Sequence, residues 1–220
     1  MKREIIITDD GSTSIHLPEW NENYHSKHGA IQEAKHVFIK NGLELFANQS
    51  MSILEIGFGT GLNALITALE AQELGLTISY DGVEAYPVEL LELQQMNFGT
   101  QFENPDVDVL FQRIHACPWN ERFLFTAHFD LIKRQQFFDT IDDVDAFDLI
   151  YFDAFGYRVQ PENWSTEIFQ KMYNALKSGG ILVTYAARGV VKRSMQQVGF
   201  VVEKLAGPPG KREMFRARKA

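Results

Sequence analysis

Apolar residues along this chain fall into two alternating patterns. Short runs with the composition of buried strands recur, and stretches with apolar residues three or four positions apart separate them. The strand-like runs are residues 53–56, 77–83, 146–152, 181–185, 201–205 and 213–217. The helix-like stretches are residues 62–74, 87–96, 161–176 and 190–198. Strands that alternate with helices in this way predict an α/β fold built on a mostly parallel sheet.

The first 50 residues follow a different pattern. Residues 4–8 are β-rich, residues 9–12 form a turn signal and residues 13–17 follow as a second strand, which together predict a hairpin. A helix is expected to begin between Ser26 and Gly29. With 220 residues, of which 45% are hydrophobic, the chain can bury one full core. We therefore expect a single domain over residues 1–220, with a hairpin and helix extension over residues 1–50 and a Rossmann-like core over residues 51–220.

Residues 97–145 carry the weakest pattern in the chain. Residues 119–123 and 129–132 are predicted to be strands of a hairpin or of an insertion at the sheet edge. The third strand of the core is then expected to end near residues 133–136.

Three alternating glycines, Gly57, Gly59 and Gly61, join the first core strand to the helix that follows it. Glycines let the backbone adopt positive φ and approach a ligand closely, and the start of the next helix offers unpaired N–H groups. This arrangement predicts a nucleotide-type cofactor site; the alternative is a tight turn without a ligand. The spacing differs from the G-x-G-x-x-G fingerprint of dinucleotide-binding folds, which disfavours a nicotinamide-dependent oxidoreductase.

Two acidic residues follow later strands. Glu84 comes after strand 77–83, about 20 residues beyond the last glycine, where a βαβ nucleotide-binding unit has a carboxylate for ribose hydroxyls. Asp153 comes after strand 146–152, and the carboxyl ends of parallel strands form the ligand crevice of such sheets. We therefore expect Asp153 at the reacting site, with Phe155 as an aromatic wall. The alternatives are a surface carboxylate for Glu84, and a helix cap or a purely cofactor-binding group for Asp153.

Charge is distributed unevenly along the chain. The formal net charge is −8, yet residues 188–220 contain nine Lys or Arg against two Glu, a local charge of +7 that leaves −15 for the remainder. Phosphate binding depends on local basic clusters, so this segment is either an RNA-binding surface or a solvated basic tail. The expected phosphate contacts are Lys192, Arg193, Lys211 and Arg212.

The remaining composition narrows the expected setting. Cys117 is the single cysteine, so no internal disulfide can form, and the N-terminal residues lack a signal-peptide pattern. No apolar run approaches the length of a membrane span. We expect a soluble, cytoplasmic protein with no membrane partner. His25, His28 and His36 are close in sequence, but no cysteine or carboxylate cluster completes a ligand set, so we predict no metal site.

The run from Glu55 through the three glycines to Asn63 resembles the cofactor loop of class I S-adenosylmethionine-dependent methyltransferases. That resemblance implies S-adenosyl-L-methionine as the cofactor and a seven-stranded, mostly parallel sheet with an antiparallel last strand. The cofactor-binding residues that it implies are Glu55, Gly57, Gly59, Gly61, Asn63, Glu84, Gln135 and Asp153. Gln135 stands where this class often has an acidic contact to the adenine amine, and Asp139 is the alternative contact.

Five segments spread over nearly the whole chain resemble a narrower family, the methyltransferases that complete 5-methylaminomethyl-2-thiouridine in tRNA. This family is known as MnmD, or as the N-terminal half of the bifunctional MnmC. The segments are Asp-Gly-Ser at 10–12, Tyr-His-Ser at 24–26 with Gly-Ala at 29–30 and Glu33, the glycine loop at 55–63, Asp-Ala-Phe at 153–155 with Pro-Glu-x-Trp at 161–164, and Gly-Lys-Arg-Glu-Met at 210–214. The chain departs from the family at Gln135, where aspartate is usual, and at residues 156–160, where Ser/Ala-Pro-x-Lys-Asn is usual.

The resemblance implies transfer of a methyl group from S-adenosyl-L-methionine to the primary amine of 5-aminomethyl-2-thiouridine at the tRNA wobble position. Asp153 would accept a hydrogen bond from that amine and orient it, because attack requires a neutral amine. Phe155, Tyr157 or Trp164 would then stack an anticodon base, and a separate enzyme would supply the aminomethyl precursor. The alternatives are a methyltransferase that acts on a small molecule or a protein, and a non-catalytic nucleotide-binding module.

Overall fold

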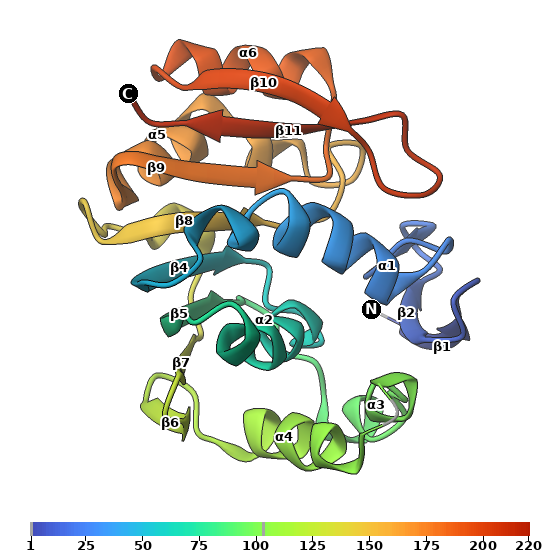
Figure 1. Cartoon of the computed structure of the whole chain (residues 1–220). Helices are drawn as coiled ribbons and strands as arrows, with labels where there is room; N and C mark the ends of the chain where they lie inside the picture. Colours follow the sequence, from blue (N-terminus) through green and yellow to red (C-terminus); the bar gives the residue numbers. More distant parts are fainter. Residues whose placement is uncertain (1, 103) are drawn as a thin grey trace.

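The computed structural model describes residues 2–102 and 104–220. Its centre is an eight-stranded sheet, and a separate three-stranded sheet lies beyond the arrowhead end of the central strand β9 (Figure 1). Helices cover both faces of the central sheet, which confirms the α/β architecture expected from the alternating pattern.

The central sheet has the strand order β10-β11-β9-β8-β4-β5-β7-β6. Its strands are β4 (Ser50–Ile56), β5 (Thr77–Val83), β6 (Arg122–Thr126), β7 (Phe129–Arg134), β8 (Phe147–Phe152), β9 (Leu176–Thr184), β10 (Val201–Ala206) and β11 (Glu213–Arg218). The last strand, β11, is antiparallel to both of its neighbours, as the sequence predicted. The predicted number of seven strands was wrong: β6 folds back on β7 as an antiparallel hairpin and adds an eighth strand at the edge.

The helices pack in two layers, one on each face of the sheet. They are α1 (Ala30–Ala34, continued as a π-helix over Lys35–Lys40), α2 (Leu62–Glu73), α3 (Leu90–Leu93), α4 (Pro105–Ala116), α5 (Thr166–Ala175) and α6 (Gly189–Gln197). Ile53 of β4 packs with α1, α2 and α4, whereas its neighbour Leu54 packs with α5 and α6. Successive side chains of a strand point to opposite faces of the sheet. Because helices cover both faces here, a central strand has apolar residues at successive positions. None of the described helices is both long and apolar enough to span a membrane.

The small N-terminal sheet consists of β1 (Glu4–Ile7), β2 (Thr13–Leu17) and β3 (Glu22–Asn23). The turn between β1 and β2 is tied to α1, because the Asp10 carboxylate accepts hydrogen bonds from the N–H groups of Ile31 and Gln32. On its other side, the Asn97 carboxamide accepts from the N–H of Thr13 at 2.8 Å. These bonds hold residues 20–26 beside the carboxyl ends of the central strands.

Three helices differ from the prediction. The helix expected over residues 161–176 is divided into a 3₁₀-helix over Pro161–Trp164 and α5. The helix expected over residues 87–96 is reduced to α3; Leu93 packs in the core, but Leu90 and Leu91 remain exposed and have no core to pack against. Helix α4 was not predicted; the side chain of Asn104 caps its start by accepting from the N–H of Asp106.

Candidate active site

A cavity of about 1460 Å³ opens at the carboxyl ends of the central strands. Its walls are the glycine loop after β4, the segments after β5, β7 and β8, residues 20–26, and Lys211 of the β10–β11 hairpin. Segments far apart in the sequence therefore meet at the edge where a doubly wound sheet binds its ligand. The volume exceeds that of a typical small-molecule pocket, which leaves room for a cofactor together with an acceptor.

The glycine loop needs its first two glycines for different reasons. At Gly57, φ is +88°, and a Cβ atom would lie 2.6 Å from the carbonyl oxygen of Asp153. At Gly59, φ is +50°, and a Cβ would lie 3.2 Å from the ring of Tyr24. A side chain at either position would therefore be strained. At Gly57 it would also collide with the backbone of the opposite wall, and at Gly59 it would press tightly against Tyr24. Gly61 begins α2 in the left-handed conformation and lies behind the cavity wall, against Phe58.

Glu84 lies at the cavity beside the glycine loop, as predicted for a ribose-binding carboxylate. One of its oxygens accepts from the N–H of Gly59 at 3.1 Å, and the other accepts from the N–H of Tyr86 at 2.9 Å. These two bonds hold the carboxylate in one orientation. Each carboxylate oxygen retains lone pairs that can accept from a ligand hydroxyl.

A buried amide bridges two carboxylates at the floor of the site. Asn63 Nδ2 donates to Glu55 Oε1 and to Asp153 Oδ2, both at 2.9 Å, and Tyr80 donates its hydroxyl to Glu55 Oε2 at 2.8 Å. Glu55 is fully buried, and burial raises the pKa of its carboxyl well above the usual range. The sequence predicted a direct cofactor contact for Glu55, but the structure places it behind Asn63 and off the cavity wall.

Asp153 lines the cavity directly after β8. Burial raises the pKa of its carboxyl to about 7, and the negative charge of Glu33 adds to the increase; the hydrogen bond from Asn63 and the charge of Lys211 oppose it. A carboxyl group that titrates near neutral pH can both accept and release a proton under cellular conditions. Asp153 is therefore placed and tuned for acid–base or positioning chemistry at the cavity.

Two histidines hold the middle of the glycine loop. The buried Thr60 contacts His25 Nε2 through its hydroxyl at 3.1 Å, and its carbonyl oxygen accepts from His115 Nε2 at 3.0 Å. The far nitrogen of His25 contacts Ser14 of β2, so the N-terminal sheet is linked to the loop. Within the described part of the chain, no group of three or more His, Cys, Asp or Glu side chains is arranged to hold a metal ion. Sequence reasoning missed His115 because it lies on the unpredicted helix α4.

These two histidines predict a loss of stability in mild acid. Burial lowers the pKa of each imidazole from 6.5 to about 4. The unfolded chain therefore binds more protons than the folded one between these values, and the free energy of unfolding should decrease as the pH falls from 6.5 to 4. The slope is at most about 1.4 kcal/mol per pH unit for each histidine.

Urea unfolding at a series of pH values measures this slope. The His115→Gln variant keeps an N–H donor for Thr60 but does not titrate, so its slope should be shallower than that of the wild type. The matched control is His128→Gln, which changes an exposed histidine. Equal slopes in all three proteins would contradict the proposed role of His115.

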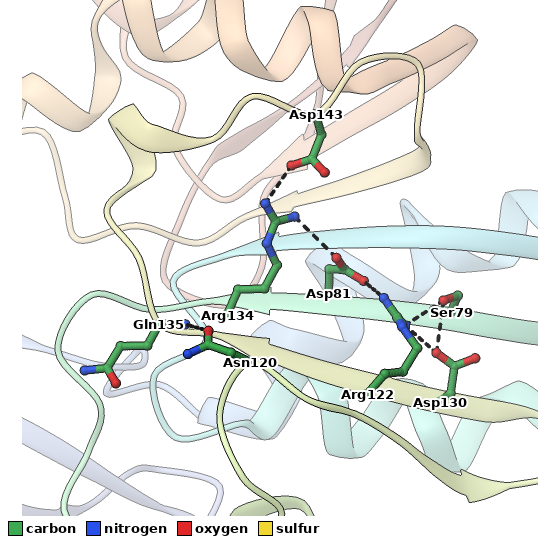
Figure 2. A network of polar contacts seen from close by, with 8 residues as sticks. All are labelled: Ser79, Asp81, Asn120, Arg122, Asp130, Arg134, Gln135 and Asp143. Atoms are coloured by element: carbon green, nitrogen blue, oxygen red, sulfur yellow. Dashed lines mark hydrogen bonds and ion pairs between the residues drawn. The ribbon is translucent and has the colours of Figure 1, made fainter.

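Gln135, the predicted adenine contact, is exposed directly after β7 and lines the cavity together with Phe137 and Asp139. Its N–H donates to Asn120 Oδ1 at 2.9 Å (Figure 2). The side chain of Asp139, the alternative contact, is also exposed at the cavity. Both candidates are therefore available to a ligand, and the geometry does not choose between them.

A polar network anchors this cavity wall to the sheet. Figure 2 shows Arg134 at the end of β7 between Asp81 of β5 and Asp143 of the following loop. The guanidinium nitrogens lie 3.3 Å from Asp81 and 2.9 Å from Asp143. Arg122 of β6 shares Asp81 and also pairs with Asp130. Of these two arginines, Arg134 is therefore the one that connects the loop carrying the cavity wall to the strands.

Replacing Arg134 with methionine should weaken cofactor binding more than it slows the reaction. Without the ion pair to Asp143, residues 135–146 lose an anchor, so the dissociation constant for the cofactor should rise by about five- to twentyfold, which corresponds to about 1–2 kcal/mol. The turnover number at saturating cofactor should stay close to that of the wild type. Calorimetric titration and steady-state kinetics measure the two quantities. Arg122→Met is the matched control, and an equal loss of affinity in it would contradict this role of Arg134.

The aromatic residues predicted to stack a base occupy different positions. Phe155 lines the cavity, with Trp20 and Tyr24 packed edge-on against its ring at centroid distances of 5.6 and 5.0 Å. Trp164 is fully buried between Phe152 and neighbouring side chains, and its Nε1 donates to the carbonyl of Phe155 at 2.8 Å. The prediction that Trp164 stacks a base is therefore wrong, because the indole has no free face; it instead holds the backbone of Phe155.

The four predicted phosphate contacts also divide. Lys211 forms an ion pair with Glu33 at the cavity, and its Nζ lies 3.9 Å from the centre of the Tyr185 ring. Lys211 is thus engaged inside the site rather than presented on the outer surface. Lys192 and Arg193 lie on α6 and Arg212 lies in the β10–β11 turn, outside the main cavity. Tyr185, which ends the β9 region, was missed by sequence reasoning although it follows a strand whose carboxyl end faces the site.

The chain has the fold of the S-adenosyl-L-methionine-dependent methyltransferases. Residues 122–220 match a family model described as S-adenosyl-L-methionine-dependent methyltransferase. The cofactor of this class is S-adenosyl-L-methionine, as the resemblance of residues 55–63 to its cofactor loop implied.

Two sequence relatives and one solved structure are more specific. The tRNA 5-methylaminomethyl-2-thiouridine biosynthesis bifunctional proteins MnmC of Hydrogenovibrio crunogenus and Cupriavidus necator are 28% and 30% identical to this chain. The matches cover 91% and 90% of this chain and 32% of each relative, so the chain spans about a third of their length. The crystal structure of MnmC2 from Aquifex aeolicus matches with a TM-score of 0.80 at 21% identity, over 100% of this chain and 70% of that one. These matches confirm the resemblance drawn from the sequence motifs, and the structural match confirms the fold class.

Proposed function

We propose that this protein transfers the methyl group of S-adenosyl-L-methionine to the primary amine of 5-aminomethyl-2-thiouridine at the wobble position of tRNA. The product is 5-methylaminomethyl-2-thiouridine. The observation that carries the proposal is the position of Asp153, between the glycine loop and the aromatic wall of Phe155 in one cavity. The likeness to the MnmC relatives over about 90% of the chain supports the choice of substrate.

The residues around the cavity fit this cofactor. Gly57 and Gly59 leave backbone space that a Cβ would fill, and Glu84 offers acceptor positions for two ribose hydroxyls. Gln135 and Asp139 are the candidates for the adenine. Bound S-adenosyl-L-methionine supplies an electrophilic methyl group. The chain itself supplies alignment, exclusion of water and a place for the proton.

Asp153 acts on the acceptor amine. An alkylammonium ion has no lone pair, so the amine must be neutral when the new N–C bond forms. The Asp153 carboxylate accepts a hydrogen bond from the amine and so directs the nitrogen lone pair. The nitrogen loses one proton as it gains the methyl group, and a carboxylate with a pKa of about 7 can take that proton.

Lys211 opposes an unwanted effect of this carboxylate. A negative charge next to the amine favours its protonated form, which cannot react. The ammonium group of Lys211 is close enough to lower the pKa of Asp153, so it also disfavours a second positive charge at the same place. Glu33 raises the pKa of Asp153 more than Lys211 lowers it, so Lys211 offsets only part of the negative charge at the acceptor end of the cavity.

Methyl transfer to tRNA tests the proposal. Tritium-labelled S-adenosyl-L-methionine is incubated with the protein and total tRNA from cells that lack it, and the nucleosides are then separated. We expect the label in 5-methylaminomethyl-2-thiouridine. Label in a metabolite or a protein fraction instead would favour the alternative substrates, and cofactor binding without label in any fraction would favour a non-catalytic nucleotide-binding module.

A further inference from the structure

A second hollow adjoins the acceptor end of the main cavity. This groove has a volume of about 500 Å³. Its walls are the segment after β8 (Gly156 and Tyr157), the segment after β9 (185–188) and the β10–β11 turn (211–213). Tyr157, Tyr185, Arg188 and Lys211 line both hollows, so the groove opens directly from the site where the acceptor binds. An RNA strand whose target base enters the main cavity can continue along this groove.

Two of the three arginines that form no hydrogen bond or salt bridge within the described residues line this groove. The chain has ten arginines. Within the described residues, seven of them donate to a carboxylate or to a backbone carbonyl. The remaining three are Arg188, Arg193 and Arg212, and all three are exposed. Glu213 also lines the groove, but its carboxylate is paired with Lys204, so the guanidinium donors of Arg188 and Arg212 are available to an anionic ligand.

Arg188 and Arg212 line the groove, and Arg193 lies on α6 outside its lining. The guanidinium carbon of Arg188 lies 5.7 Å from the centre of the Tyr157 ring. This cation–π contact holds the side chain without using its N–H donors. The guanidinium of Arg193 lies against Gly189, the first residue of α6, and therefore next to Arg188. Arg212 lies across the groove from them, in the turn that projects at the same end of the sheet as the N-terminal strands (Figure 1).

We propose that this groove binds the nucleotide next to the target uridine, with its phosphate on Arg188 and Arg212 and its base or ribose against Tyr157. The inference rests on the proposed function and names the part of the substrate that the groove holds. A hollow of this size with an aromatic wall fits a single nucleotide. Arginine forks bind phosphate oxygens in pairs, which a solvated basic tail would not organise.

The test measures RNA binding separately from methyl transfer. The probe is a fluorescein-labelled anticodon stem-loop RNA without uridine modification, titrated by fluorescence anisotropy at several salt concentrations. The variant is Arg188→Gln with Arg212→Gln. Arg218→Gln is the matched control, because Arg218 is also exposed but binds the carbonyl of Gly179 at the other end of β11. Melting temperature and cofactor affinity report whether each variant is folded.

In the double variant, we expect the dissociation constant for the RNA to rise at least tenfold. The slope of log K against log salt should become shallower by about one for each phosphate group that the variant no longer binds. The control should match the wild type in both quantities. Unchanged affinity and slope in the folded double variant would overturn the proposed role of the groove and leave the proposed methylation intact. Wild-type protein that methylates tRNA without measurable stem-loop binding would lead to the same conclusion. Loss of binding in the double variant, with no methylation of tRNA by the wild type, would support the groove and overturn the proposed reaction.

Discussion

Replacement of Asp153 by asparagine should remove most of the methyl transfer while cofactor binding stays close to normal. Asparagine keeps an oxygen that can accept from Asn63, so the floor of the site remains paired. It cannot take a proton and carries no charge to direct an amine. Loss of a group that positions and deprotonates the nucleophile typically lowers turnover by about 10²–10⁴-fold. The expected result is a turnover number in that range below the wild type, with a dissociation constant for S-adenosyl-L-methionine that changes little.

The pH dependence of turnover and of stability is a second test of the Asp153→Asn variant. Because the pKa of Asp153 is raised to about 7, wild-type turnover should increase with pH through 7, and the asparagine variant should lack this step. Stability should change in the opposite direction. A carboxyl whose pKa is raised on folding contributes its full stabilisation at a pH below its unfolded pKa of 3.8. This stabilisation is lost as the pH rises through the folded pKa of about 7. The variant should therefore melt at a higher temperature than the wild type at pH 8.

Stopped-flow or quenched assays of single turnovers across pH 6–9, together with calorimetric cofactor titration and thermal melting, measure these quantities. The decisive comparison is between affinity and turnover. If Asp153→Asn binds the cofactor much more weakly but reacts normally at saturation, Asp153 is a cofactor ligand only. If the melting temperature of Asp153→Asn at pH 8 is lower than that of the wild type, the carboxylate has a structural role beyond the cost of burying its charge.

Replacement of Gly57 by alanine should abolish cofactor binding. The new Cβ would lie 2.6 Å from the Asp153 carbonyl, and the backbone at φ +88° already disfavours any side chain. The loop and the segment after β8 would have to separate, although both contribute to the cavity. We expect a loss of cofactor affinity of at least about 100-fold, on the scale of 2.7 kcal/mol or more.

Gly179 supplies the matched control for this experiment. It also has a positive φ, +78°, but a Cβ there would meet nothing within 4 Å. Gly179→Ala therefore carries a similar backbone strain, about 1 kcal/mol, without the collision. Calorimetric titration of both variants separates the two effects. Equal affinity in the two variants would show that the close approach of Gly57 to Asp153 is not required for binding.

The elements that could be predicted from sequence are those whose signal is local. The strands 77–83 and 201–205 and helix 62–74 were placed within one residue of their observed ends, because each has a turn residue close beside it. Helix α4 was missed since its sequence is only weakly apolar and its burial depends on Phe98 and other distant residues. The predicted helix over 87–96 was too long because Leu90 and Leu91 fit the helical pattern but are exposed and contact no core.

The sequence by itself determined the type of site. A strand, alternating glycines, a helix and acidic residues after later strands are local patterns, and the rule that carboxyl ends of parallel strands share one edge brings Gly57, Glu84 and Asp153 together without further information. Those three residues do line one cavity. The motifs also indicated the class of methyltransferase, which the family model and the fold confirm.

Only the tertiary structure decided what each side chain does there. Trp164 and Lys211 are of residue types that often contact RNA. In the structure, however, Trp164 is fully buried and Lys211 is paired with Glu33. Glu55 lies behind Asn63, and the pKa of Asp153 depends on the burial that the surrounding elements create. The sequence specifies chemical groups and local backbone preferences. Burial, partners and charge environment come from contacts between segments far apart in the chain, which no local pattern contains.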